Sequence, residues 1–212
     1  MLYDFERHLG EVERKVISLE KHGAQARAVI LSRAYETSIE DLWDAITNKE
    51  RLPRWFAIVE GELQLGGRYQ VQGNAGGKII ECNPPHKFSL TWEFSGDVSW
   101  IDVALTAEGP ESARLTLTHT SKLSPHWEQY GPGATGVGWE LGLLGLAIHF
   151  ADPKADKIDE EAFAASAEGK AFGCGSSKQW SEAAIAAGEE PEKARAWDAR
   201  IAAFYTGESE AT

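Results

Sequence analysis

The feature that most constrains this chain is the glycine-rich apolar segment Gly131–Phe150, GPGATGVGWELGLLGLAIHF. On a helix with 3.6 residues per turn, Gly138, Gly142 and Gly145 form one narrow stripe. Apolar side chains flank this stripe, and Glu140 marks an opposite face that we expect to be solvated. A helix that is apolar nearly all round is a buried one. Because glycine costs about 1 kcal/mol relative to alanine in a helix interior, the stripe indicates either a close backbone contact or room for another molecule.

Composition excludes several classes of function. The chain has 212 residues, 42% of them hydrophobic and 10% aromatic, which is enough for a proper core. Its formal net charge of -12 argues against nucleic-acid binding, which needs clustered Lys and Arg, and against binding to anionic membranes. We therefore predict no nucleic-acid partner and no membrane partner.

The sequence also predicts a cytoplasmic location. Residues 1–16 are charged throughout and contain no apolar core, so they do not resemble a signal peptide. The apolar run over 137–150 contains a glutamate and is too short to span a bilayer. Two cysteines, Cys82 and Cys174, are too few for a disulfide scaffold, which favours a reducing compartment.

The expected elements follow an α+β order. Helical spacing predicts an N-terminal helix over 1–24, and the tail after Phe150 is rich in Ala and Glu, with helices but no strand-like run. We therefore predict an N-terminal helix over 1–25, an α+β domain over 26–150 and a docked helical extension over 151–212. The expected strands are 26–35, 58–65, 68–72, 78–82, 88–94, 100–106 and 113–120, and the other expected helices are 38–47, 48–56 (short, interrupted by Pro53), 133–150, 159–167, 178–187 (capped by Ser176 or Ser177) and one that starts near Pro191.

Motifs for catalysis are missing from the sequence. It has no phosphate-binding loop, no Gly-x-Ser-x-Gly elbow and no histidine–carboxylate spacing typical of a metal site. We therefore predict no catalytic residues, no metal and no cofactor. Two histidines are of interest, because His119 falls on the apolar face of its strand and His149 on the glycine stripe. Each is either a core histidine satisfied by a backbone partner or a polar group that orients a ligand.

Aromatic residues are the second sequence feature that bears on a ligand site. Trp55, Trp92 and Trp139 lie on faces that should point inward, where aromatic rings are either plain core or the walls of a ligand cage. Small glycines opposite large rings favour a cavity between sheet and helix. Arg54 and Arg68 either bind a ligand carboxylate or form surface salt bridges.

Five blocks follow one another along the chain: SIEDLWDAITNKERLPRWF, LQLGGRYQ, GGKIIECNPPHKFSLTWEF, ARLTLTHT and GVGWELGLLGLAIHF. Together and in this order they resemble the SRPBCC (START-like) superfamily, in particular the branch named for homology to an activator of a heat-shock ATPase. The tail resembles the C-terminal extension of some bacterial members. The resemblance implies a helix-grip fold, in which a curved antiparallel sheet wraps around the long helix 133–150 and encloses a cavity. It also implies that members bind lipids, hormones or polyketides, that some are enzymes, and that the namesake stimulates a chaperone ATPase.

Our favoured hypothesis is a binding protein for a small, largely hydrophobic molecule. One alternative is a cyclase- or hydrolase-like enzyme with His119 or His149 as general base, oriented by Glu81 or by Asp102, although strand alternation puts Asp102 on the outer face. Another is a chaperone-associated interaction protein, and a homodimer is also possible. The predicted cavity residues are Trp55, Phe56, Tyr69, Leu90, Trp92, Leu117, His119, Trp139, Leu143 and His149.

Overall fold

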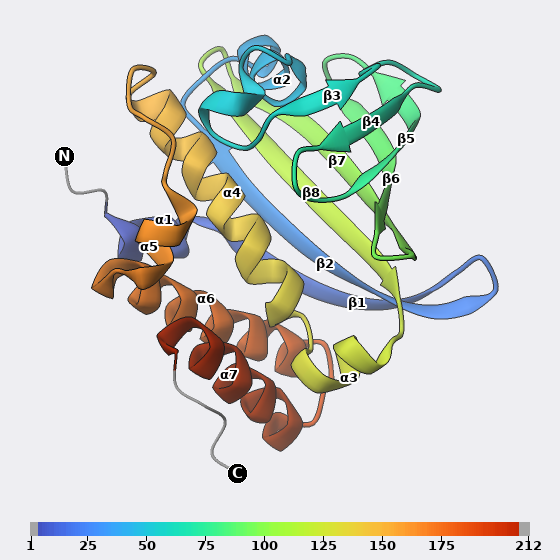
Figure 1. Cartoon of the computed structure of the whole chain (residues 1–212), viewed down its shortest axis with the longest axis vertical. Helices are drawn as coiled ribbons and strands as arrows, with labels where there is room; N and C mark the ends of the chain where they lie inside the picture. Colours follow the sequence, from blue (N-terminus) through green and yellow to red (C-terminus); the bar gives the residue numbers. More distant parts are fainter. Residues whose placement is uncertain (1–3, 208–212) are drawn as a thin grey trace. The chain divides into compact units, whose positions relative to one another are not determined.

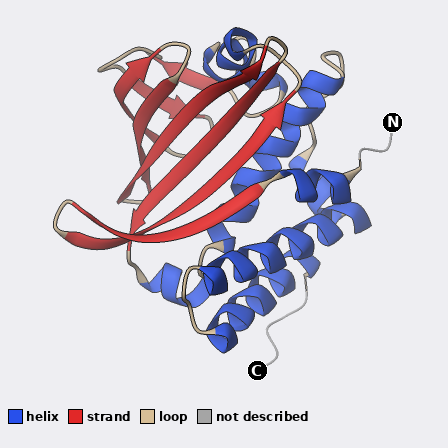
Figure 2. Ribbon diagram, turned by 180° about the vertical axis from the view of Figure 1, so that it is seen from behind, coloured by secondary structure: helices blue, strands red, loops and turns tan. Residues whose placement is uncertain are grey.

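The computed structural model describes residues 4–207 and has the predicted α+β architecture (Figure 1). Its strands form a curved antiparallel sheet with the order β1-β2-β8-β7-β6-β5-β4-β3, and Figure 2 shows the curvature of the strands. Among the described residues the strands are β1 Glu13–Lys21, β2 Ala24–Tyr35, β3 Val59–Gly61, β4 Arg68–Val71, β5 Gly76–Asn83, β6 Lys87–Phe94, β7 Asp97–Gly109 and β8 Ser112–Lys122.

The helices include the long apolar helix and a helical C-terminal extension, both as predicted. Contacts divide the chain into two compact units, and β2 and α4 contribute residues to both. Unit 1 comprises 1–31, 122–141 and 158–212, and unit 2 comprises 32–121 and 142–157. The described helices are α1 Phe5–Glu11, α2 Ile39–Thr47, the 3-10 helix η1 Leu52–Arg54, α3 Pro125–Tyr130, α4 Gly133–Ala151, α5 Glu160–Ala165, α6 Ala167–Ala186 and α7 Pro191–Thr206.

The N-terminal helix predicted over 1–24 is wrong beyond Glu11, because residues 13–21 form β1 instead. A two-residue turn at His22 and Gly23 joins β1 to β2, and both turn residues have positive φ angles of 51° and 74°. Such angles fit the tight hairpin turns whose twist matches that of the flanking strands. Pairing with β2 therefore overrides the helical spacing of the apolar residues.

Two further predictions are corrected in unit 1. Helix α3 was not among the expected helices, and Ser124 caps it by accepting a hydrogen bond from the Trp127 amide. Helix α6 begins at Ala167, well before the predicted start, and Ser176 and Ser177 are buried inside it rather than capping it. Glycines within α6 lower its helix propensity and hide its first half in the sequence.

In unit 1, large side chains of the C-terminal extension pack on glycines in and next to α4. A Cβ built on Gly131 would lie 2.2 Å from the Trp197 ring, and one on Gly136 would lie 2.1 Å from the Trp180 ring. The Trp197 indole N–H also donates to the Glu128 carbonyl of α3 at 2.9 Å. These glycines therefore provide close contact surfaces for α6 and α7.

Arg14 and Glu140 form a buried ion pair in unit 1. Nε and Nη2 of Arg14 donate to the two carboxylate oxygens of Glu140 at 2.7 and 2.6 Å, and Nη1 donates to the carbonyls of Leu9 and Val12. The side chains are 6% and 0% exposed, so the prediction that Glu140 lies on a solvated face is wrong. A charge on an apolar helix is accommodated here by a bidentate partner instead of by water.

In unit 2, one face of the strands is apolar. The register pairs Leu90 with Ile101 and Trp92 with Ser99, and it pairs Ile101 with His119 on the next strand. Directly paired residues lie on the same face of an antiparallel sheet, so these side chains share one face, which we call the inner face. Helix α2 begins as predicted, because Ser38 accepts a hydrogen bond from the Asp41 amide.

The three glycines of the α4 stripe have different surroundings. A Cβ built on Gly138 or Gly142 would meet no other atom within 4 Å. A Cβ on Gly145 would lie 2.6 Å from the Trp55 carbonyl oxygen. The close backbone contact is therefore confirmed at Gly145, whereas room for another molecule beside Gly138 or Gly142 stays a prediction.

Helix α4 is 19 residues long and apolar enough to cross a membrane by length and composition. The helix is longer than the apolar run over 137–150, which we judged too short for such a span. Half of its most apolar 18-residue window is buried inside the fold, and the core helix of a soluble protein passes the same test.

The glycine surroundings predict opposite effects for two matched substitutions. Gly142→Ala should raise the free energy of unfolding by up to about 1 kcal/mol, because alanine favours the helix and the new methyl group meets no atom. Gly145→Ala should lower it by about 1–3 kcal/mol, because the methyl group would clash with a backbone oxygen. Urea denaturation of the two variants measures both effects. Equal effects would contradict the assignment of open space at Gly142 and a close backbone contact at Gly145.

The buried ion pair predicts that losing one partner is worse than losing both. Glu140→Leu should lower the free energy of unfolding by about 3–5 kcal/mol, because it leaves the Arg14 guanidinium buried without its counter-ion. Adding Arg14→Met should recover much of that loss. Denaturant titration of both variants measures these free energies of unfolding. A Glu140→Leu variant as stable as the wild type would contradict the burial of the ion pair.

Candidate functional site

Most of the predicted cavity residues lie in unit 2, and several of them pack together there. Tyr69 is buried in a cluster with Leu52, Val59, Val71 and Ile79. Trp55, Phe56, Leu90 and Trp92 pack against this cluster and are only partly buried. Leu117 and Leu143 are buried. Trp139 belongs to unit 1, where it is half-buried on α4.

Strand β6 has apolar side chains on its inner face that are not fully buried. Leu90 and Trp92 are only partly buried, and Phe94 is 52% exposed, although all three belong to the apolar inner face. On the opposite face Ser89 is 3% exposed, whereas Thr91 and Glu93 are partly buried. The apolar row of β6 is therefore a partly accessible surface of unit 2.

His119 forms a polar pair with Ser99 on the inner face. Its Nε2 lies 2.8 Å from the Ser99 hydroxyl, and the Trp92 ring is 6.4 Å away, centroid to centroid. The Ser99 hydroxyl also donates to the Trp92 carbonyl at 3.2 Å. Burial lowers the pKa of His119 to about 4, so its ring is neutral at pH 7. Ser99 was not predicted, although strand alternation with Ile101 places it on this face.

His149 instead belongs to a charged network. It is 6% exposed, and its Nε2 lies 3.3 Å from an Arg51 nitrogen. Arg51 in turn bonds to Asp41 at 2.5 Å and Asp44 at 3.0 Å on α2. Because arginine only donates, Nε2 must accept and carry no proton. Burial, followed by the charges of Arg51 and Arg54, lowers the pKa of His149.

This contact gives His149 a side chain as its hydrogen-bond partner, whereas we considered a backbone partner. A role in ligand contact stays a prediction for this residue. Arg51 was not predicted, because nothing in its local sequence pattern distinguishes it from a surface charge.

The two carboxylates considered as partners for a catalytic histidine lie on the face opposite His119. Asp102 pairs in register with Ser89 and accepts a hydrogen bond from its hydroxyl at 2.5 Å. Glu81 accepts from the same hydroxyl at 3.3 Å and pairs with Lys87 at 2.7 Å. Both carboxylates therefore stabilise the outer face of the sheet.

Arg68 also pairs on the outer face, with Glu93 at 2.9 Å. This contact is the salt bridge that we considered as one role for Arg68. Arg54 is exposed in η1. Among residues 4–207, no group of three or more His, Cys, Asp or Glu side chains could hold a metal ion.

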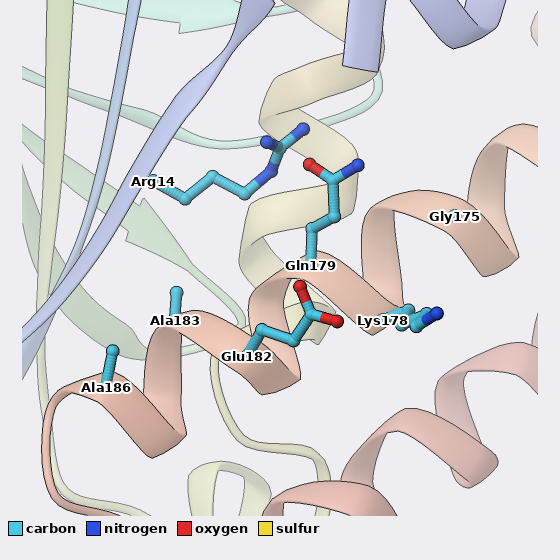
Figure 3. Close-up of a pocket in the computed structure, with 7 residues that line it drawn as sticks. All are labelled: Arg14, Gly175, Lys178, Gln179, Glu182, Ala183 and Ala186. Carbon is cyan, nitrogen blue, oxygen red and sulfur yellow. The ribbon is translucent and has the colours of Figure 1, made fainter. Parts of the chain in front are cut away.

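Unit 1 contains a separate pocket of about 480 Å³ (Figure 3). Arg14 extends into it from β1, and the remaining lining residues come from α6. Two of these, Lys178 and Glu182, are exposed and of opposite charge. Because Glu140 already neutralises Arg14, the pocket has no net charge that would select an ion. The α6 residues are Gly175, Lys178, Gln179, Glu182, Ala183 and Ala186.

Comparisons with solved structures identify proteins of the same fold. The crystal structure of CalU16 from Micromonospora echinospora is 27% identical, covers 82% of this chain and 98% of its own, and has a TM-score of 0.64. The solution structure of CalU16 is 26% identical over 83% and 96% of the two chains, with a TM-score of 0.69. EF2215 from Enterococcus faecalis, a conserved protein of unknown function, is 18% identical over 87% and 96%, with a TM-score of 0.60, and shows the fold alone.

A search of curated protein sequences gives no significant match. A family model described as Activator of Hsp90 ATPase homolog 1-like protein matches residues 36–151, which is more than half of the chain. This match confirms the resemblance noted in the sequence, and the helix-grip neighbours agree with it. The chain therefore belongs to the family of Activator of Hsp90 ATPase homolog 1-like proteins.

Proposed function

We propose that this chain is a binding protein for a small, largely hydrophobic molecule, held against the inner face of β6–β8 in unit 2. The observation that supports the proposal most is the accessible apolar row of β6, with Leu90 and Trp92 partly exposed. In the same unit, Gly142 of α4 lacks a side chain where a Cβ would meet open space. Apolar and aromatic side chains are the usual lining of a site for a small apolar molecule.

The driving force for such binding is removal of apolar surface from water, about 25 cal/mol per Å². Large aromatic side chains contribute most of this surface, and stacking on an aromatic ligand adds to it. Trp92 offers such a ring on the inner face, and Trp55 and Phe56 pack with it around the Tyr69 cluster.

Catalysis by a histidine has less support. A general base works best when its pKa is near the operating pH, whereas burial lowers the pKa of His119 to about 4. Glu81 and Asp102, the carboxylates that would orient the histidine, bond to Ser89 on the outer face. A chaperone-associated role rests on the family description alone, so we rank it last.

The proposal predicts that filling the space beside Gly142 blocks binding. The uncharged probe N-phenyl-1-naphthylamine should become fluorescent on binding to the wild-type protein, and Gly142→Leu should weaken its affinity about tenfold or more, because the new side chain occupies the site. Fluorescence titration measures both affinities, and circular dichroism melting verifies that the variant folds.

Ala104→Leu is the matched control for this titration. Ala104 is exposed on the outer face of β7, so the same enlargement there should leave probe affinity unchanged. Absence of probe binding to the wild type, or equal binding by wild type and Gly142→Leu, would reject the site.

A further inference from the structure

We propose that Arg51 and His149 form a latch that holds the aromatic wall of the site closed, and that acid opens this latch and lowers ligand affinity. The inference rests on the proposed function and adds regulation to the same site. The aromatic wall is Trp55 and Phe56, which pack on the Tyr69 cluster. The latch and the wall belong to one compact unit, unit 2.

Arg51 ties α2 to the part of the chain that carries the wall. Its Nη1 donates to the carboxylates of Asp41 at 2.5 Å and Asp44 at 3.0 Å, both on α2. The Trp55 indole N–H donates to the Ala45 carbonyl of α2 at 3.0 Å. These bonds join α2, η1 and the wall into one body, which we call the α2–η1 segment.

His149 holds the α2–η1 segment to the end of α4. Nη2 of Arg51 lies 3.3 Å from His149 Nε2, and the guanidinium carbon lies 5.9 Å from the centre of the Phe150 ring. Arginine has only donors, so the neutral histidine presents its unprotonated nitrogen here. In this closed arrangement the Trp55 carbonyl oxygen also packs on Gly145, where a Cβ would lie 2.6 Å from it.

Protonation of His149 breaks the latch. An imidazolium carries a proton on both ring nitrogens and has no lone pair for Arg51. Two positive groups would then face each other at 3.3 Å. Because His149 is only 6% exposed, water would screen this repulsion weakly. Repulsion would separate the α2–η1 segment from α4 and take the aromatic wall with it.

The charges around His149 determine the direction of the pH effect. Burial and then Arg51 and Arg54 lower its pKa, whereas Asp41 of α2 raises it, and the net pKa is below the ordinary value. In an open arrangement water reaches the ring, so its pKa returns to about 6.5 and it binds the proton more tightly. The closed arrangement therefore loses population as the pH falls below about 6.5.

Asp41 and His119 keep one charge state between pH 7 and pH 5. Burial alone would raise the pKa of Asp41, but hydrogen bonds from Thr37 and Arg51 lower it below its ordinary value, so its carboxylate stays ionised. The pKa of His119 is about 4, so its ring stays mostly neutral. Among the histidines of unit 2, only His86 and His149 are left to titrate in this interval.

Fluorescence titration with N-phenyl-1-naphthylamine at pH 7 and pH 5 tests the latch, because the arylamine nitrogen of this probe is uncharged at both. Wild type should bind the probe about fivefold or more weakly at pH 5, since uptake of one proton changes an equilibrium by up to about tenfold per pH unit. His149→Gln should bind equally well at both, because a glutamine oxygen accepts from Arg51 and does not titrate. Arg51→Gln, which lacks the repelling charge, should bind more weakly at pH 7 and lose the pH dependence.

His86→Gln is the matched control, because His86 is exposed between β5 and β6 and its replacement should leave the pH dependence intact. Circular dichroism at pH 5 verifies folding, and global unfolding of wild type there would overturn the inference, since the latch opens within the folded protein. Equal wild-type affinity at the two pH values, or a pH dependence retained by His149→Gln or Arg51→Gln, would also overturn it and leave the apolar site standing. Failure of wild type to bind the probe at pH 7 would instead count against the proposed function itself.

Discussion

The packing of this protein depends on where α4 and the turn before it lack side chains. Gly131 and Gly136 receive the rings of Trp197 and Trp180, so the C-terminal extension can approach closely. Gly145 receives the Trp55 carbonyl oxygen, which brings η1 against the end of the helix. At Gly142 no atom fills the space that a Cβ would take. The helix propensity lost at Gly136 and Gly145 is thus offset by close contacts, whereas at Gly142 a Cβ would meet open space.

A second constraint is the charge of Glu140 on the same helix. Its carboxylate is fully buried and would be costly without a partner, and Arg14 supplies two hydrogen bonds from β1. The same guanidinium satisfies two carbonyl groups at the end of α1. Buried ion pairs contribute little net stability compared with apolar residues, but one with this geometry favours a single arrangement of α1, β1 and the first half of α4.

Local patterns predicted the parts of the fold that local forces determine. The strand over 88–94 and the helix over 38–47 are set by patterns within a few residues, and both predictions are confirmed. The N-terminal helix failed because β1 is stabilised by pairing with β2, and local spacing does not record that partner. The environment of Glu140 failed for the same reason, since Arg14 is 126 residues away in sequence.

The residues of the candidate site were likewise predictable only where a local sequence pattern places them. Alternation placed Trp92 and His119 on one face, and applied to β7 it would also have placed Ser99 there. The contact between His149 and Arg51 depends on the packing of α2 and η1 against the end of α4, and no pattern in the sequence indicated it.

The central claim is that unit 2 holds a small apolar molecule in the space left beside Gly142. Native mass spectrometry of the freshly purified protein tests it most directly, because gentle ionisation retains a co-purified ligand. The account predicts a discrete mass above that of the chain, lost after denaturation and missing from Gly142→Leu purified in the same way. A wild-type protein that has the bare chain mass, and keeps it after incubation with uncharged polycyclic compounds, would contradict the account.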